Sequence, residues 1–143
     1  MKLREIMTQC VVRIHPEESA AVAARTLARY NVGMLPVCGS DGRIYGVVTD
    51  RDLVTRCIAA GRMPASTPVR DIMTANVVSA LPDMDTVAAA RLMGRQQIRR
   101  LPVLENGRLC GMVSLADLAA REETASDATD ALTGISNNIS VRD

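Results

Sequence analysis

The chain contains an internal repeat, and this feature constrains its fold more than any other. Leu35-Pro36-Val37 recurs as Leu101-Pro102-Val103. The stretch 46–52 likewise recurs at 111–117, and the only length difference between the copies falls in a turn. A unit of about 60 residues buries so little surface that it is only marginally stable alone. The repeat therefore predicts two similar units that share a core.

Each copy has the hydrophobic and turn pattern of a β-α-β-β-α unit. The expected order is a short strand, a capped helix, a hairpin and a second helix, at residues 11–14, 19–30, 35–48 and 50–60 and again at 77–80, 85–96, 101–113 and 115–122. We predict an α+β (α/β-like) fold in which two pseudo-twofold-related units pack through their sheets. The predicted boundaries are repeat 1 at 1–62, a linker at 63–68, repeat 2 at 69–122, and a polar tail at 123–143 that is weakly helical or disordered and lies mostly outside the core.

The second strand of each hairpin leads into a helix through a turn with a glycine, two apolar residues, a hydroxyl and an aspartate. In the first copy the hydroxyl and the acid are Thr49 and Asp52, and in the second they are Ser114 and Asp117. This spacing is typical of a helix capping box. The same geometry also offers N–H groups to a phosphate and a carboxylate to a ribose diol. The occurrence of the turn in both copies favours the ligand interpretation.

Composition weakens several other function classes. Aromatic residues make up 1% of the chain and the net charge is +1, so base-stacking nucleic-acid modules and anionic membranes are not expected partners. The chain starts with charged residues and has no long apolar run, so the expected compartment is the cytoplasm. His15 is the only histidine and no cysteine belongs to a C-x-x-C pair, so we expect no metal site. Since no nucleophile with a partner base is apparent, we expect no catalytic activity.

The repeated unit, the Leu-Pro-Val strand and the Gly-h-h-[Ser/Thr]-x-x-Asp turn together resemble a CBS (cystathionine-β-synthase) domain. Two in tandem resemble a Bateman module of the stand-alone bacterial type, over about residues 3–122. The resemblance implies a homodimeric regulatory module that binds AMP, ADP or ATP between its repeats. S-adenosylmethionine, NAD-type dinucleotides and cyclic dinucleotides are further ligands that the resemblance implies, and no cofactor is required.

The resemblance also assigns roles to residues of this chain. Asp52 and Asp117 would accept hydrogen bonds from ribose, and Thr49 and Ser114 would lie near the phosphate or ribose. Apolar side chains just after each glycine would contact the adenine, and segments before each first strand would clamp the base. These residues are Val47 and Met112 for the adenine, Thr8, Cys10 and Val11 for the Asp117 cleft, and Thr74, Asn76 and Val77 for the Asp52 cleft.

The two clefts differ in their arginines. In the family, the residue two before the strand proline often binds phosphate. Here that residue is Arg100 in the second copy but Met34 in the first. Arg51, after the first-copy turn, is the substitute candidate, and Ala116 replaces it in the second copy. We therefore expect unequal clefts.

One alternative function stays open at this point. A CBS pair with empty clefts would serve as a protein-interaction module, although both aspartates and both hydroxyls are retained. In either case we expect a homodimer that buries apolar helix faces, with Val54, Ile58 and Leu118 as candidate interface residues.

Overall fold

The two copies of the repeat do not coincide with the two packing units of the protein. The computed structural model describes residues 1–121 and 124–141. One unit, here named the Asp52 unit, comprises Val12–Val77 with Gly107–Leu109. The other, named the Asp117 unit, comprises Met1–Val11, Val78–Asn106 and the rest of the chain from Cys110. Each unit is therefore completed by the first residues of the other copy of the repeat.

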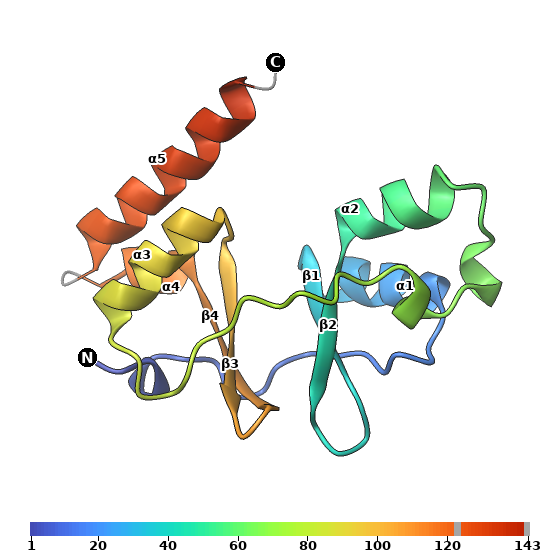
Figure 1. Ribbon diagram of the computed structural model, residues 1–143, viewed down its shortest axis with the longest axis horizontal. Coiled ribbons are helices and arrows are strands. Elements are labelled where there is room, and N and C mark those ends of the chain that lie inside the picture. The colour runs from blue at the N-terminus through green and yellow to red at the C-terminus, as the bar shows by residue number, and fades with distance from the viewer. Residues whose placement is uncertain (122–123, 142–143) are drawn as a thin grey trace. The chain divides into compact units, whose positions relative to one another are not determined.

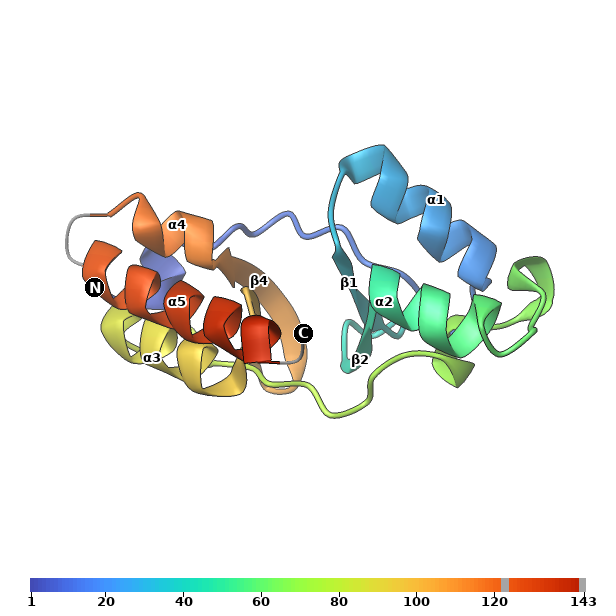
Figure 2. The same ribbon diagram turned by 90° about the horizontal axis from the view of Figure 1, so that it is seen from above.

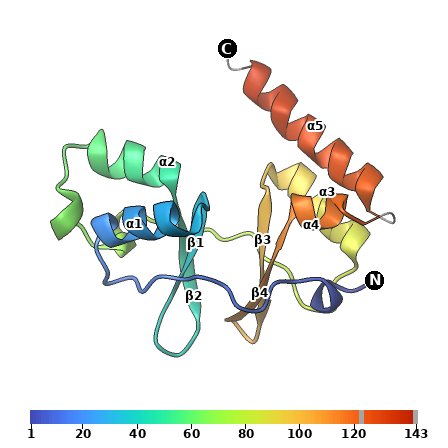
Figure 3. The same cartoon turned by 180° about the vertical axis from the view of Figure 1, so that it is seen from behind.

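The Asp52 unit is a β-hairpin with helices on one of its faces (Figures 1 and 3). Strand β1 pairs antiparallel with β2, Met34 opposite Thr49, with an irregularity after Val37. The helix that follows β2 begins as α-helix and continues as π-helix. The elements in chain order are α1 (Ala20–Tyr30), β1 (Met34–Cys38), β2 (Ile44–Thr49), α2 (Asp50–Asp52), η2 (Leu53–Ile58) and the 3₁₀ turns η3 (Pro64–Ser66) and η4 (Val69–Asp71).

The Asp117 unit repeats this plan and adds a helix (Figure 1). Strands β3 and β4 form its hairpin, with α3 and α4 on one face. The elements are η1 (Leu3–Glu5), α3 (Thr86–Gln96), β3 (Arg100–Glu105), β4 (Arg108–Ser114), α4 (Leu115–Ala119) and α5 (Ala125–Val141).

The long helices α1 and α3 begin and end where the sequence predicts, because their caps are encoded locally. Ser19 accepts a hydrogen bond from the Val22 amide at 3.2 Å, and Asp85 accepts one from the Val87 amide at 3.0 Å. Such caps satisfy amides that have no partner within the helix. Asn31 and Gln97 end the helices with φ of 52° and 57°, the left-handed conformation that often follows a last helical turn.

The prediction of strands at 11–14 and 77–80 is wrong. Each is reduced to one parallel bridge, between Ile14 and Val37 and between Ala80 and Val103. The chain passes from one unit to the other beside these segments, after Val11 and after Val77. Only a few residues then remain before the proline that ends each pairing, so a longer ladder cannot form.

Each unit has its own aliphatic core between its hairpin and its helices. On α1 the buried positions are Ala20, Ala23 and Leu27. The two cores include Leu35, Val37 and Val48 in the Asp52 unit and Leu101, Val103, Val113 and Leu118 in the Asp117 unit.

The described part of the polar tail departs from the prediction. Residues 125–141 form α5, which packs on α3 and α4 (Figure 2). Ala128, Ala131 and Ile135 are buried in the core of the Asp117 unit, so the expectation of a tail mostly outside the core is wrong there. Leu118 is fully buried beneath this layer, so it is not an interface residue. No helix among residues 1–121 and 124–141 has the length and hydropathy of a membrane-spanning segment.

Candidate functional site

Both Gly-to-Asp turns form complete capping boxes. The Asp52 amide donates to Thr49 Oγ1 at 3.0 Å, and the Thr49 amide donates to Asp52 Oδ2 at 3.1 Å. The Asp117 amide donates to Ser114 Oγ at 3.1 Å, and the Ser114 amide donates to Asp117 Oδ2 at 2.9 Å. A carboxylate has about four acceptor positions, so the box leaves capacity for a ligand. Because α4 has only five residues, its dipole adds little.

The segments expected to clamp the base lie beside the expected adenine-contacting residues. Thr74 and Val47 exchange two backbone hydrogen bonds of 2.8 and 2.9 Å. Thr8 and Met112 exchange an equivalent pair of 2.9 and 3.0 Å. In each unit, the clamp segment therefore pairs antiparallel with the strand that leads to the aspartate.

The glycine of each turn is needed for this close approach. A Cβ on Gly46 would lie 2.6 Å from the Thr74 carbonyl oxygen, and one on Gly111 would lie 2.5 Å from Met7 Sδ. Both glycines are buried in ordinary strand conformation. Their role is steric: they admit the crossing segment, which the sequence motif alone does not reveal.

The carboxylate of Asp52 is enclosed by protein groups. Its residue is 7% exposed. Thr74 Oγ1 lies 3.3 Å from both carboxylate oxygens, and Arg56 Nε lies 3.8 Å from Oδ1. Arg56 also donates to the Met73 carbonyl at 2.9 Å, which ties it to the clamp segment. Sequence reasoning missed Arg56, although its position four residues after Asp52 on a helix is the spacing of an ion pair.

The carboxylate of Asp117 is more accessible. It is half-buried, and within the described part of the chain its hydrogen bonds are those of the capping box. Thr8, the counterpart of Thr74, is exposed. Arg121, the counterpart of Arg56, directs its guanidinium to Met1 Sδ at 3.6 Å. Asp117 therefore retains acceptor positions that Asp52 has given to Thr74 and Arg56.

A cavity of about 370 Å³ adjoins Ser114 in the Asp117 unit. Arg99 and Arg100 line it at the start of β3. Its other walls come from α4 and α5, namely Leu115, Ala116, Ala119, Ala128, Thr129 and Leu132. Two guanidinium groups beside a hydroxyl form a site that suits a phosphate.

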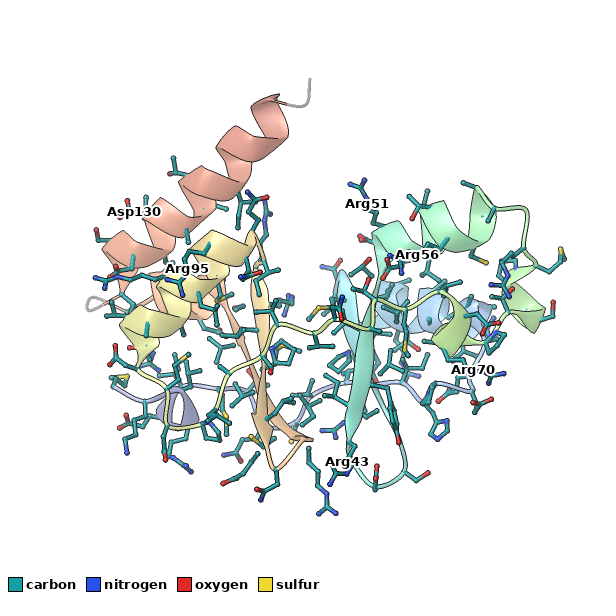
Figure 4. The ribbon with its side chains drawn as sticks, viewed as in Figure 1. Arg43, Arg51, Arg56, Arg70, Arg95 and Asp130 are labelled. Atoms are coloured by element: carbon teal, nitrogen blue, oxygen red, sulfur yellow. The ribbon has the colours of Figure 1, made fainter. Side chains whose placement is uncertain are left out.

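The substitute arginine of the first copy is placed less favourably. Arg51 is exposed and projects away from the start of α2 (Figure 4). Met34, the counterpart of Arg100, is half-buried at the start of β1. The arginines beside the two turns therefore differ in their placement.

The remaining candidate residues lie on the clamp segments. Cys10 and Asn76 are exposed, and Val11 and Val77 are half-buried. Burial raises the pKa of the Cys38 and Cys110 thiols, which leaves them as apolar packing groups at neutral pH. Within residues 1–121 and 124–141, His, Cys, Asp and Glu side chains form no group of three that could hold a metal ion.

Comparison with known proteins places this geometry in a family. The family model described as "CBS domain" matches residues 3–58 and 69–135, so its second match extends into α5. The CBS domain-containing protein YhcV of Bacillus subtilis is 38% identical over 135 residues, which cover 94% of this chain and 95% of that protein. Hypoxic response protein 1 of Mycobacterium tuberculosis is 32% identical over 116 residues, covering 81% of each chain.

Solved structures show the same similarity. Hypoxic Response Protein I, solved with two coordinated zinc ions, superposes with a TM-score of 0.78 at 30% identity, covering 85% of this chain and 98% of that one. The CBS domain pair of protein MJ0100, solved with 5′-methylthioadenosine and S-adenosyl-L-methionine, gives a TM-score of 0.73 at 25% identity, covering 84% and 94%. With two matches to one family model and these relatives along its length, the chain belongs to the CBS-domain family, with two copies of the domain in tandem.

Proposed function

We propose that this protein is a regulatory module that binds an adenosine phosphate, of the AMP, ADP or ATP type, in its Asp117 unit and has no catalytic activity of its own. The observation that carries the proposal is the accessible Asp117 carboxylate next to Ser114 and the Arg99–Arg100 cavity. A carboxylate and an arginine-lined cavity that both adjoin Ser114 match the ribose diol and the phosphate of one nucleotide.

The neighbouring apolar groups fit the base. Met112 follows Gly111 in β4 and is hydrogen-bonded through its backbone to Thr8. A thioether packs well against an aromatic ring, and the backbone of the clamp segment offers groups to a base edge. The adenosine ligands in the related MJ0100 structure support this ligand class.

The Asp52 unit is proposed as a second, weaker site. Ribose binding there requires Asp52 to exchange contacts with Thr74 and Arg56 for contacts with the ligand. Its phosphate contact depends on Arg51, which projects into solvent. We expect this site to fill only after the Asp117 site.

Titration calorimetry with adenosine, AMP, ADP, ATP and GMP tests the proposal directly. We expect saturable binding of at least one adenosine phosphate, weaker binding of adenosine, and no binding of GMP beyond weak phosphate contacts. Asp117→Ala should weaken the tightest site by roughly tenfold to more than a hundredfold, the range for a charge-assisted hydrogen bond. Equal binding of GMP and AMP, or full binding by Asp117→Ala, would contradict the proposed recognition.

We also propose self-association through the helices of the Asp52 unit. Val54 and Ile58 are each 59% exposed on η2, and large exposed aliphatic side chains on one helix commonly mark an interface. The same face supports the alternative function of a protein-interaction module. Light scattering should give the mass of a dimer for the parent and of a monomer for Val54→Asp/Ile58→Asp. A monomeric parent at micromolar concentration would rule the dimer out.

A further inference from the structure

We propose that α5 is a wall of the Asp117 site, and that nucleotide binding and the docking of α5 on α3 strengthen each other. This inference rests on the proposed function, since the nucleotide is the ligand through which the coupling acts. It assigns the C-terminal helix a role in transmitting the occupancy of the site.

The cavity beside Ser114 supplies the first argument. Arg99 and Arg100 line it at the start of β3, while Thr129 and Leu132 line it from α5. Thr129 Oγ1 donates to the Ala125 carbonyl at 2.9 Å, so its oxygen remains an acceptor. Leu132 is 43% exposed and would lose exposure when a ligand fills the cavity. A nucleotide with its phosphate at Arg100 therefore contacts α5 only while the helix is docked.

The docking of α5 depends on a close helix crossing. A Cβ on Gly94 would lie 3.1 Å from both Cα and Cβ of Ala131, so the two helices meet where α3 has no side chain. Arg91 Nε and Asp127 Oδ1 lie 3.6 Å apart beside this crossing. A groove runs between α3 and α5 at this crossing, and Arg95 and Asp130 line it (Figure 4). A larger side chain at residue 94 would therefore push the helix away.

The first copy of the repeat provides an internal reference. Ala90 on α3 is fully buried beneath α5, whereas its counterpart Ala24 on α1 is exposed. The counterpart of Gly94 is Ala28, which is also exposed. In the Asp52 unit, both counterpart positions on α1 are therefore open to solvent. The Asp52 site thus lacks the wall that α5 gives the Asp117 site.

Coupling follows from these contacts by linkage. A ligand that binds the docked form better than the undocked form shifts the helix toward docking. By reciprocity, docking strengthens ligand binding by that same factor, so a change that favours undocking weakens ligand binding by at most this factor. Because Leu132 and Thr129 border the cavity rather than fill it, we expect a coupling of about tenfold, within the usual range for two coupled sites.

The test combines AMP titration with amide hydrogen exchange on the full chain. In the parent protein, AMP should slow exchange in residues 125–141, and Asp117→Ala should abolish this effect. Gly94→Val should speed exchange in the same residues and weaken AMP binding about tenfold. The matched control Ala28→Val, at the equivalent position of α1, should change AMP affinity by less than about twofold, because Ala28 is exposed.

Leu132→Ser keeps the test decisive if Gly94→Val does not fold. This substitution leaves the buried contacts of α5 in place and removes only its exposed apolar wall, so we expect weaker AMP binding with unchanged exchange in the ligand-free protein. The inference is overturned if AMP leaves α5 exchange unchanged, or if Gly94→Val mobilises α5 without weakening AMP. In that case the proposed function stands as long as Asp117→Ala loses AMP. A parent that binds no AMP overturns both.

Discussion

The two aspartates should separate stability from ligand binding, because their carboxylates lie in different surroundings. Asp52 is buried and contacts Thr74 and Arg56. Asp117 is half-buried, and among the described residues its carboxylate is hydrogen-bonded only within its own capping box. We predict that Asp52→Ala costs more folding stability than Asp117→Ala. We also predict that Asp117→Ala costs more AMP affinity than Asp52→Ala.

The magnitudes follow from the contacts that each substitution removes. Either substitution removes the hydrogen bond that the amide of Thr49 or Ser114 donates to the carboxylate, which is worth about 1 kcal/mol. At Asp52, the half-buried Thr74 hydroxyl also loses its acceptor, at about 1–3 kcal/mol. The pair with Arg56, whose side chain is 51% exposed, adds about 0–1 kcal/mol. We therefore expect a loss of about 2–5 kcal/mol for Asp52→Ala and about 1 kcal/mol for Asp117→Ala.

Urea denaturation followed by circular dichroism measures both losses, with thermal melting as a second readout. At roughly 3 °C per kcal/mol for a chain of this size, Asp52→Ala should lower Tm by about 6–15 °C and Asp117→Ala by about 3 °C. The isosteric variants Asp52→Asn and Asp117→Asn keep an acceptor oxygen and serve as controls. Equal losses from both alanine variants, or a larger loss at Asp117, would refute the reasoning from the hydrogen-bond partners.

Three further predictions follow from the same structure. Arg100→Met should remove most of the affinity gain of AMP over adenosine, about 1–3 kcal/mol, and this gain should shrink with added salt in the parent protein. An unchanged gain in calorimetry would show that Arg100 does not contact the phosphate. Gly111→Val should destabilise the protein by at least about 1–3 kcal/mol through overpacking against Met7, as measured by urea denaturation. A denaturation curve like that of the parent would mean that the segment containing Met7 moves freely. Iodoacetamide at neutral pH should label exposed Cys10 within minutes but spare buried Cys38, because the raised pKa of the Cys38 thiol makes its labelling increase only at higher pH. Mass spectrometry of the peptides measures the labelling, and rapid labelling of Cys38 would show that the core opens easily.

The sequence by itself determined the repeated unit and the main elements of each copy. The caps at Ser19 and Asp85 and the hairpin turn at Asn106-Gly107 are local features, so they could be predicted from a few neighbouring residues. The capping boxes of the Asp52 and Asp117 turns were predictable for the same reason.

How these elements combine depends on long-range packing, which only the tertiary structure shows. The segment before each first strand completes the unit of the other copy, and local propensity carries no record of such long-range pairing. The different exposure of Asp52 and Asp117 depends on Thr74, Arg56 and Arg121, whose directions are set by packing. The docking of α5 depends on the missing side chain at Gly94. A polar, alanine-rich helix has little intrinsic tendency to be buried, and it becomes part of a core because another helix leaves it room.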